Sequence, residues 1–234
     1  MEWAQLGVSI NGESEFDLSG YSVSVNDAGN RVAIGAIHND AAGSDAGHVR
    51  VYEYTTSNPV WSQLGVDING EAAGDLSGQS VSLNDAGDRV AIGAPNNDGA
   101  GSNAGHVRIF EYIDSSWIQL GADIDGEAAS DESGNAVSLN GAGDRVAIGA
   151  HYNDGAVGSF TGHVRIYEYS DSSFAWTQLG SDIDGEASND KSGTSVSLNN
   201  VGDRVAIGAP FNDATGGSGG DAGHVRIYEF GDSV

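Results

Sequence analysis

One phrase recurs four times along the chain, and this repetition limits the possible folds more than any other feature. The motif Trp-x-Gln-Leu-Gly begins at four positions that lie 56 to 59 residues apart: Trp3, Trp61, Trp117 and Trp176. Each copy continues with Arg-Val-Ala-Ile-Gly-Ala, then an Asn-Asp pair, then Gly-His-Val-Arg. A long, near-identical repeat predicts an array in which each unit packs against its neighbours.

Each repeat contains four strand-like runs. In the second repeat they cover residues 80–84, 89–93, 106–112 and 117–124. The first two runs are joined by Asp85-Ala86-Gly87-Asp88, in which the glycine supplies the positive φ of a tight hairpin. The Val-Ala-Ile stretch at 90–92 is continuously apolar, which predicts a strand buried on both faces. The 36 glycines and 3 prolines of the chain also favour many short strands and turns.

Four-stranded repeats of this length are typical of β-propeller blades, so we expect an all-β fold of four four-stranded antiparallel blades. The chain starts with a fourth strand, 3–10, and ends with a third strand, 224–230. The N-terminal strand would therefore complete the last blade and close the ring. This predicts one repeat domain over 1–234, with blades near 18–69, 76–125, 132–184 and 191–230 plus 3–10. The alternative is two chains that share one eight-bladed ring.

The charge balance excludes several functions. The net charge is −25, from 34 acidic against 9 basic residues. Nucleic acids and anionic membrane surfaces need Lys and Arg patches, so neither is an expected partner. No apolar run approaches the roughly 20 residues that span a bilayer, and no signal peptide is recognisable, so membrane insertion is not expected. The absence of cysteine leaves the redox compartment open.

Three segments of the second repeat, 77–83, 90–95 and 105–110, carry a family resemblance. They resemble the FG-GAP repeat of integrin alpha-subunit propellers, with Ser77-Gly78 in place of Phe-Gly and with Gly93-Ala94-Pro95 matching Gly-Ala-Pro. The resemblance extends over all four repeats. It implies a propeller from an extracellular or cell-surface protein that takes part in adhesion. The family often has a calcium loop between the first two strands, whereas 84–88 is too short to wrap calcium.

Most acidic residues fall in connections that an antiparallel blade places on one face. Oxygen-rich loops with glycine suit calcium, so this face is a hypothetical calcium site. Its candidate ligands are Asp67, Glu71, Asp75, Asp123, Asp125, Glu127, Asp131, Asp182, Asp184, Glu186 and Asp190. The alternative is that these acids are turn formers, and that the Asp of each Asp-x-Ser-Gly motif fixes the turn before the first strand.

The loops between the second and third strands differ in length and content, as recognition loops on a rigid scaffold do. A protein or glycan ligand is therefore expected to bind there. The candidate binding residues are the repeated pairs Asn39, Asp40, Asn97, Asp98, Asn153, Asp154, Asn212 and Asp213.

Other repeated residues have structural interpretations. His48, His106, His163 and His224 each begin a third strand and are expected to pack or to form hydrogen bonds, whereas His38 and His151 follow no pattern. The repeated arginines indicate structural salt bridges. The tryptophans favour packing between blades over sugar stacking.

No asymmetric catalytic constellation is recognisable, since nearly every candidate residue occurs four times. The leading prediction is therefore a non-catalytic binding or adhesion module, not an enzyme, that docks its ligand on the acidic face. A carbohydrate-binding propeller is one alternative, with Tyr21, Tyr152 and Phe211 as its irregular aromatics. The others are an enzyme with its site in the central funnel and a structural spacer.

Overall fold

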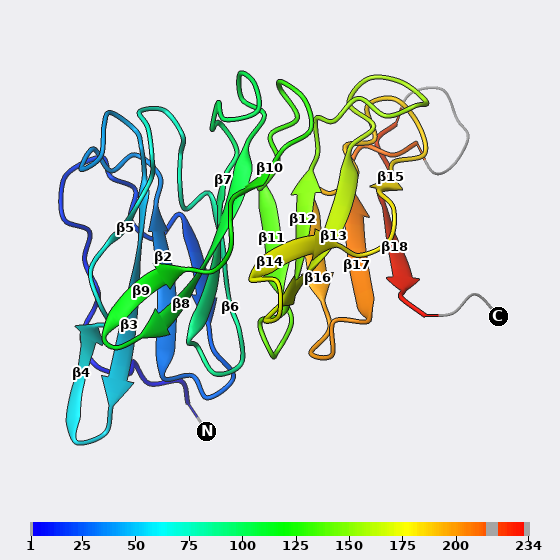
Figure 1. Cartoon of the computed structure of the whole chain (residues 1–234). Coiled ribbons are helices and arrows are strands. Elements are labelled where there is room, and N and C mark those ends of the chain that lie inside the picture. The colour runs from blue at the N-terminus through cyan, green and yellow to red at the C-terminus, as the bar shows by residue number, and fades with distance from the viewer. Residues whose placement is uncertain (1, 214–219, 232–234) are drawn as a thin grey trace.

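The computed structural model describes residues 2–213 and 220–231, and this part of the chain is all-β. Four antiparallel sheets follow one another along the chain (Figure 1). The first sheet contains β1 (Ser22–Val25), β2 (Arg31–Ala36), β3 (His48–Thr55), β4 (Asn58–Gln63) and β5 (Ile68–Asn69). The second contains β6 (Ser80–Leu83), β7 (Arg89–Ala94), β8 (His106–Ile113), β9 (Ser116–Gln119) and β10 (Ile124–Asp125). The third contains β11 (Ala136–Leu139), β12 (Arg145–Ala150), β13 (His163–Ser170), β14 (Ala175–Gln178) and β15 (Ile183–Asp184). The fourth contains β16 (Ser195–Leu198), β17 (Arg204–Ala209) and β18 (His224–Glu229).

The propeller-like fold class predicted from the repeat is confirmed. In the second sheet, β7 lies between β6 and β8, and its Val90, Ala91 and Ile92 are at most 1% exposed. This is the two-sided burial that the apolar run predicts. None of the residues that the structure describes forms a helix that is long and apolar enough to cross a membrane.

The outer strand of each complete sheet is broken into two short pieces, which the sequence pattern did not predict. The expected strand at 117–124 is divided into β9 and β10, which both pair with β8. Gly121 lies between them at a φ of 80°, in the left-handed region. The chain therefore turns here, and the outer strand contacts β8 at two separate places.

Neighbouring sheets pack face to face. The apolar cluster between the first two sheets combines Val49 and Val51 from β3 with Leu83, Val90 and Phe110 from the second sheet. The innermost strands of successive blades are linked as well, because the Ser24 hydroxyl accepts a hydrogen bond of 2.9 Å from the backbone amide of Leu83. The same bond recurs from Leu139 to Ser82 and from Leu198 to Ser138.

The tryptophans join the outer strands of neighbouring blades, as the packing interpretation predicts. The indole Nε1 of Trp117 donates a 2.7 Å hydrogen bond to the carbonyl oxygen of Leu64, in the outer connection of the preceding blade. Trp176 bonds to Leu120 in the same way, and Trp61 bonds to Leu6.

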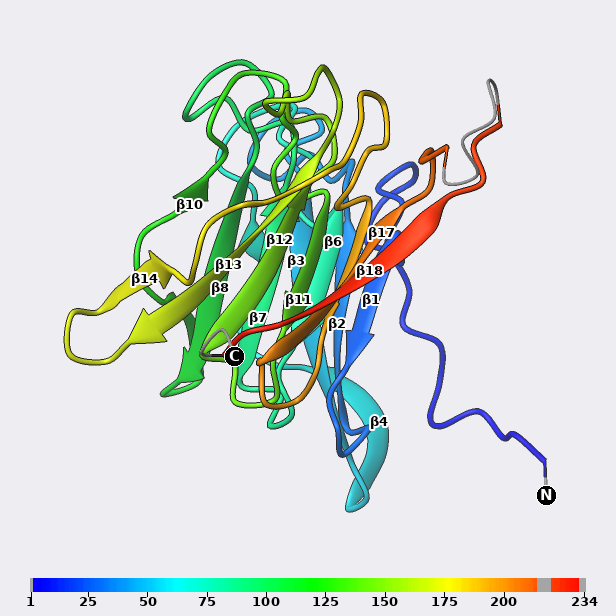
Figure 2. The same ribbon diagram turned by 90° about the vertical axis from the view of Figure 1, so that its right-hand side faces the viewer.

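The blades form an open arc, with the first sheet at one end and β18 at the other (Figures 1 and 2). The described residues 3–10 have no strand assignment and do not join the fourth sheet, which has the order β16-β17-β18. Their Leu6 carbonyl accepts the bond from Trp61, so they lie beside the first blade, in the place that an outer strand of a preceding blade would take. The expected closure by 3–10 within one chain is therefore not formed.

Candidate functional site

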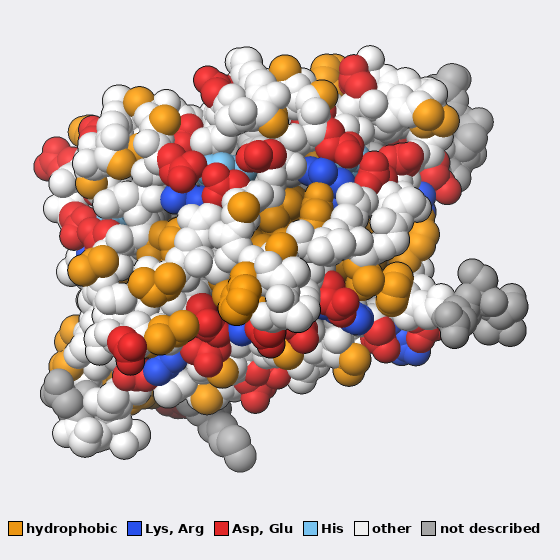
Figure 3. Space-filling model, viewed as in Figure 1, with side chains coloured by type: hydrophobic (Ala, Val, Ile, Leu, Met, Phe, Trp, Pro, Cys, Tyr) orange, Lys and Arg blue, Asp and Glu red, His pale blue; other side chains and the backbone are white. Residues whose placement is uncertain are grey.

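The links that precede each first strand lie beside the loops between second and third strands, as antiparallel blades require. The isolated bridge between Gly47 and Ser77 joins one such loop to the link of the next blade. We call this edge of the molecule the loop face. Figure 3 views the molecule from the side with the loop face at the top, and acidic side chains lie across the upper half of this view, with histidine and Lys or Arg side chains among them.

Four buried carboxylates on the loop face are occupied by internal hydrogen bonds. Asp75 is 3% exposed and accepts bonds of 3.0 Å from both the Asn97 side-chain amide and the Ala72 backbone amide. The same arrangement recurs for Asp17 with Asn39, Asp131 with Asn153 and Asp190 with Asn212. These contacts explain the Asp-x-Ser-Gly motif as a device that holds each link to its loop.

The second member of each Asn-Asp pair is exposed. Asp40, Asp98 and Asp154 each accept a hydrogen bond of 2.8–2.9 Å from a backbone amide of their own loop. Asp213 is exposed too. Asp125 and Asp184 are exposed at the ends of β10 and β15, where their backbone carbonyls accept bonds from Arg165 and Arg226. None of these contacts shows whether the residues bind a ligand or a metal ion, so their binding roles stay predictions.

The repeated histidines lie beside predicted acidic ligands. Three Glu–His–Asp groups each have one potential ligand atom per residue, all within 4.8 Å of one another. The groups are Glu13–His48–Asp67, Glu71–His106–Asp123 and Glu127–His163–Asp182. In the fourth repeat, His224 Nδ1 lies 3.6 Å from Glu186. Sequence reasoning missed the histidines as ligands because each group combines a link, a third strand and an outer connection that lie far apart in the sequence, as in Glu71, His106 and Asp123, so only the folded blade brings the group together.

The donor set of these groups fits a divalent metal ion. Burial lowers the pKa of His48, His106 and His163, so each imidazole is neutral near pH 7 and can offer a lone pair. His48 is 1% exposed, and its Nδ1 has no hydrogen-bond partner although it faces Glu13 at 3.9 Å. In each group an arginine also lies 3.4–3.7 Å from the glutamate and competes for it. The groups could therefore hold a metal ion after a small contraction.

A second cluster, between the third and fourth blades, is not repeated. Its members are Glu132, His151, Tyr152, Lys191 and Phe211. Glu132 and Lys191 occupy the same position in successive repeats, the left-handed residue of the Asp-x-Ser-Gly turn, where both have a φ of 52°. In the first two repeats this position is Leu18 and Leu76. The same turn position thus carries one acid and the only lysine of the chain, and the charge of Lys191 acts on Glu132.

Distances within the unrepeated cluster are short. A Glu132 oxygen lies 3.7 Å from His151 Nε2, and the His151 ring stacks near Tyr152 with centroids 4.0 Å apart. The ammonium of Lys191 lies 4.6 Å from the centre of the Tyr152 ring and 4.7 Å from that of Phe211, within the range of cation–π attraction.

Two residues of the cluster, His151 and Glu132, have pKa values shifted from their ordinary values. Burial, assisted by the charge of Lys191, lowers the pKa of His151 to about 4, so this imidazole is neutral near pH 7. Burial also raises the pKa of Glu132, against the opposing effect of Lys191. A carboxylate with a raised pKa is a stronger base than an exposed one, and such shifts are typical of acid–base sites.

A cavity of about 130 Å³ adjoins the cluster. Tyr152, Phe160, Asn153 and the 128–131 link line it. Phe160 stands edge-on to Tyr152 with ring centroids 5.4 Å apart. The cluster shares Tyr152 with this cavity, so its basic carboxylate, neutral imidazole and cation lie next to a cavity that has an aromatic wall.

Comparisons with known proteins inform the fold. No protein-family model and no curated protein matches the chain. Among the solved structures that are similar to it, two are each described as a "putative 6-phosphogluconolactonase". The one from Bacteroides uniformis is 10% identical with a TM-score of 0.56, over 90% of this chain and 50% of that one. The one from Bacteroides fragilis is 12% identical with a TM-score of 0.53, over 88% and 49%.

These comparisons support the propeller-like fold, and the chain spans about half the length of the structures that it matches. Neither description mentions FG-GAP repeats or integrins. The prediction of a non-catalytic adhesion module, and with it the prediction that the protein is not an enzyme, is contradicted by the descriptions of these two structures, which share the fold and are described as enzymes. The argument from repetition did not consider that unlike residues at equivalent turns, Glu132 and Lys191, can belong to one cluster across a blade boundary.

Proposed function

We propose that the protein is a hydrolase that cleaves an ester or lactone bond of a neutral, carbohydrate-like substrate at the unrepeated cluster. The observation that carries this proposal is the Glu132–His151–Lys191 group, in which a carboxylate with a raised pKa and a neutral imidazole lie 3.7 Å apart beside an aromatic cavity. The aromatic rings of Tyr152 and Phe160 provide the apolar surface on which a sugar ring can stack.

In the proposed reaction, the Glu132 carboxylate takes a proton from water as the water oxygen attacks the carbonyl carbon. The resulting oxyanion is stabilised by the Lys191 ammonium. The rings of Tyr152 and Phe211 hold this ammonium in place. The tetrahedral intermediate then expels the alkoxide, which takes the proton from Glu132. His151 is neutral and acts as a positioning residue for Glu132. The products are a carboxylic acid and an alcohol.

Two further points support the substrate class. The similar folds are described as lactonases of a phosphorylated sugar acid, which is lactone chemistry on a carbohydrate. The net charge of −25 repels phosphorylated substrates, and only one lysine stands in the cluster. We therefore infer a preference for an uncharged sugar lactone over its phosphate ester.

The test is lactone hydrolysis followed by proton release in a pH-stat, with glucono-δ-lactone and its 6-phosphate as probes. We expect hydrolysis above the spontaneous rate, faster for the uncharged lactone. Removal of the base in Glu132→Gln should lower kcat by about 100-fold or more. The matched control is Glu15→Gln, which removes one exposed carboxylate elsewhere on the loop face and should leave kcat unchanged.

The pH profile separates chemistry from folding. Burial raises the pKa of Glu132, so kcat/KM of the wild-type protein should fall on the acid side with an apparent pKa above the ordinary 4.5 of glutamate. Hydrolysis that is no faster than the spontaneous reaction with either probe, or full activity in Glu132→Gln, would overturn the proposal.

A second candidate function is metal binding at the Glu–His–Asp groups, supported by the unpartnered, buried Nδ1 of His48. Calcium prefers oxygen ligands alone, whereas an imidazole with two carboxylates suits Zn²⁺ or Mn²⁺. We therefore expect Zn²⁺ to raise the melting temperature more than Ca²⁺ at the same ionic strength. Glu71→Gln should reduce this rise, and Glu15→Gln should not. Equal effects of Zn²⁺, Ca²⁺ and Mg²⁺ would indicate screening only.

The remaining predictions stand as proposals. An extracellular or cell-surface location rests on the FG-GAP resemblance and the acidity, and the Asn-Asp loops remain candidates for contacts with a glycan or protein. A secretion assay of the protein in its native host tests the location.

A further inference from the structure

Neighbouring blades contact each other through a tryptophan and a pocket, and this contact is formed three times in the structure. One half of the contact is a tryptophan of the later blade, and the other is a Leu-Gly pocket of the earlier one. A Cβ on Gly65 would lie 2.9 Å from the Trp117 ring, and one on Gly121 would lie 2.9 Å from Trp176. Gly7 has the same relation to Trp61 at 3.2 Å.

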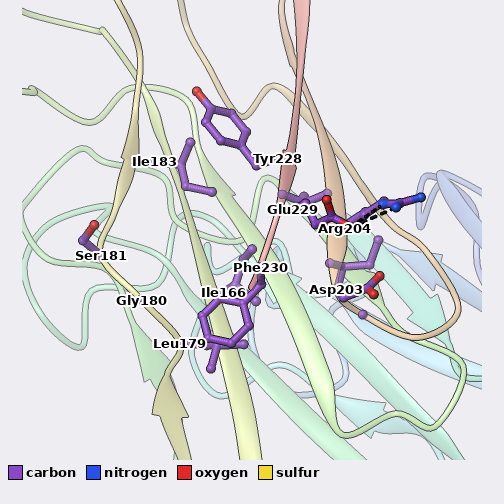
Figure 4. Close-up of a pocket in the computed structure, with 13 residues that line it drawn as sticks. Ile166, Leu179, Gly180, Ser181, Ile183, Asp203, Arg204, Tyr228, Glu229 and Phe230 are labelled. Atoms are coloured by element: carbon purple, nitrogen blue, oxygen red, sulfur yellow. Dashed lines mark hydrogen bonds and ion pairs between the residues drawn. The ribbon is translucent and has the colours of Figure 1, made fainter. Parts of the chain in front are cut away.

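The fourth copy of this pocket, at the end of the arc, is not filled by a described residue. A Cβ on Gly180 would meet only the Phe230 ring, at 4.0 Å. A cavity of about 160 Å³ lies here, lined by Leu179, Gly180, Tyr228 and Phe230 among others (Figure 4). The fourth tryptophan of the repeat, Trp3, is fully exposed at the opposite end of the arc.

The hairpin turns between the first two strands form a second contact between neighbouring blades, in which the earlier blade supplies the side chain and the later blade supplies the glycine. Arg31, Arg89 and Arg145 each donate a 3.2–3.3 Å hydrogen bond to a glycine carbonyl in the next blade: Gly87, Gly143 and Gly202. The equivalent arginine of the last blade, Arg204, is 61% exposed and has no such bond among the described residues. The equivalent glycine of the first blade, Gly29, has open space around it.

The faces at the two ends of the arc are apolar and exposed. Val225 and Ile227 on β18 are 66% and 73% exposed, whereas the equivalent Val107 and Ile109 on β8 are at most 1% exposed beneath the next blade. Val23 and Val25 on β1 are more than 60% exposed as well. Each end thus carries the half-contact that the other end lacks.

We propose that a second copy of this chain completes the last blade, with its residues 3–10 added beside β18 as the missing outer strand. Trp3 of the second copy fills the cavity at Gly180, and Arg204 bonds to its Gly29 carbonyl. The register of the third blade, in which Tyr169 pairs with Trp176 and Tyr167 with Gln178, places Phe230 opposite Trp3 and Tyr228 opposite Gln5. The same junction on the other side closes a ring of two chains.

A second copy is the occupant that the contacts favour, because both halves of the contact are present in this one sequence. Closure within one chain would require β18 to reach residues 3–10, which lie beside the first blade at the opposite end of the arc, where the Leu6 and Asn11 carbonyls accept hydrogen bonds from Trp61 and Arg50. Two copies also match the length of the solved structures of which this chain covers half.

The first test is the mass in solution, by light scattering during size-exclusion chromatography. We expect twice the chain mass of 23.9 kDa for the wild-type protein. Trp3→Ala should give the single-chain mass with an unchanged circular dichroism spectrum, since Trp3 is fully exposed in one chain. Gly180→Asn should do the same, because Asn tolerates the positive φ of 80° but fills the tryptophan pocket.

The matched control is Gly74→Asn, at a φ of 88° with nothing within 4 Å, which should stay dimeric. Single-chain mass for the wild-type protein at 100 µM, or a dimer in both Trp3→Ala and Gly180→Asn, would overturn the proposal.

Crosslinking then identifies the partner strand. The chain has no cysteine, so the double variant Ala4→Cys, Glu229→Cys carries the only thiols, at positions that the register places opposite each other. Oxidation should give a covalent dimer on a denaturing gel. An intramolecular crosslink would instead show a four-bladed ring of one chain, and a ladder of larger species would show open-ended assembly; both outcomes overturn the two-chain ring.

Discussion

Glycines in the middle strands set how closely two blades approach. A Cβ on Gly93 would overlap the Gly134 carbonyl oxygen of the next blade, and one on Gly149 would overlap the Gly193 carbonyl oxygen. Both obstacles are backbone atoms that cannot rotate away. The repeated geometry of the blade boundary therefore depends on the absence of a side chain at these positions.

Gly149→Ala should consequently cost about 3 kcal/mol or more, because two blades must separate to admit the methyl group. The comparison is Gly208→Ala in the last blade, where the new Cβ meets mainly the rotatable hydroxyl of Ser195. There the cost should be below about 1 kcal/mol. Urea unfolding of both variants at low protein concentration measures the difference, and equal losses would contradict this account of the boundary.

His151 makes the protein sensitive to acid. Its pKa is lowered to about 4 by burial and by Lys191, whereas in the unfolded chain it titrates near 6.5. The unfolded state therefore binds more protons between these values, and stability falls as the pH decreases from 6.5 to 4. The full effect is at most about 3 kcal/mol.

The observable is the difference in unfolding free energy between the wild-type protein and His151→Asn, measured from pH 7.5 to 4. This difference should shrink as the pH falls, because the variant lacks the group that must be protonated. Glu132, whose pKa is raised by burial, is present in both proteins. A difference that is independent of pH would show that His151 titrates normally.

Each outer strand of a complete sheet is split into two short pieces, so its own pairing holds it only weakly. We attribute its position mainly to the hydrogen bond and packing of its tryptophan against the Leu-Gly pocket of the preceding blade, which we call the tryptophan clamp. Trp117 is 9% exposed and bonds to the Leu64 carbonyl. Trp117→Ala should cost about 3–5 kcal/mol, and Trp117→Phe about 1–2 kcal/mol, because the phenyl ring restores packing but not the hydrogen bond.

The control is Trp3→Ala, the same substitution at the same repeat position but on a fully exposed side chain. At protein concentrations low enough to give single chains, it should change the unfolding free energy by less than about 0.5 kcal/mol. Thermal and urea unfolding both report these values. An equal loss of unfolding free energy in Trp3→Ala and Trp117→Ala would show that the tryptophan contact does not stabilise the blades.

The elements themselves were largely predictable from the sequence, because each strand is bounded by turn residues and repeated with the same phase. The three strands of the second repeat before Trp117 begin where expected, at Ser80, Arg89 and His106. The broken outer strand was not predictable, since glycine in the Leu-Gly phrase can serve either an extended or a left-handed conformation.

The candidate site was predictable only in part. The sequence places Asp131 and Asp190 in turns, and the structure confirms the hydrogen bonds expected of turn formers. The sequence did not indicate that Glu132 and Lys191, each one residue further on, converge with His151 across a blade boundary. Such a group depends on the rotation between neighbouring blades, which no local pattern encodes.

At the scale of the whole molecule, the net charge of −25 opposes folding through self-repulsion. Added monovalent salt screens this repulsion, so the melting temperature should rise by several degrees between 0.01 and 0.5 M NaCl, as the Debye length falls from about 30 Å to a few Å. NaCl and KCl should act equally in a differential scanning measurement. A melting temperature that is constant or falls over this range would show that the acidic loop face is neutralised internally.

The exposed Trp3 and the cavity at Gly180 lie on different surfaces of the chain, so a contact between them is head-to-tail and can be repeated without limit. Whether it ends after two chains depends on the rotation from blade to blade and on any rise along the axis. A substitution at a blade boundary that alters this rotation by a few degrees would turn a closed ring into a growing helical fibre. The glycines of the middle strands therefore determine solubility as well as stability.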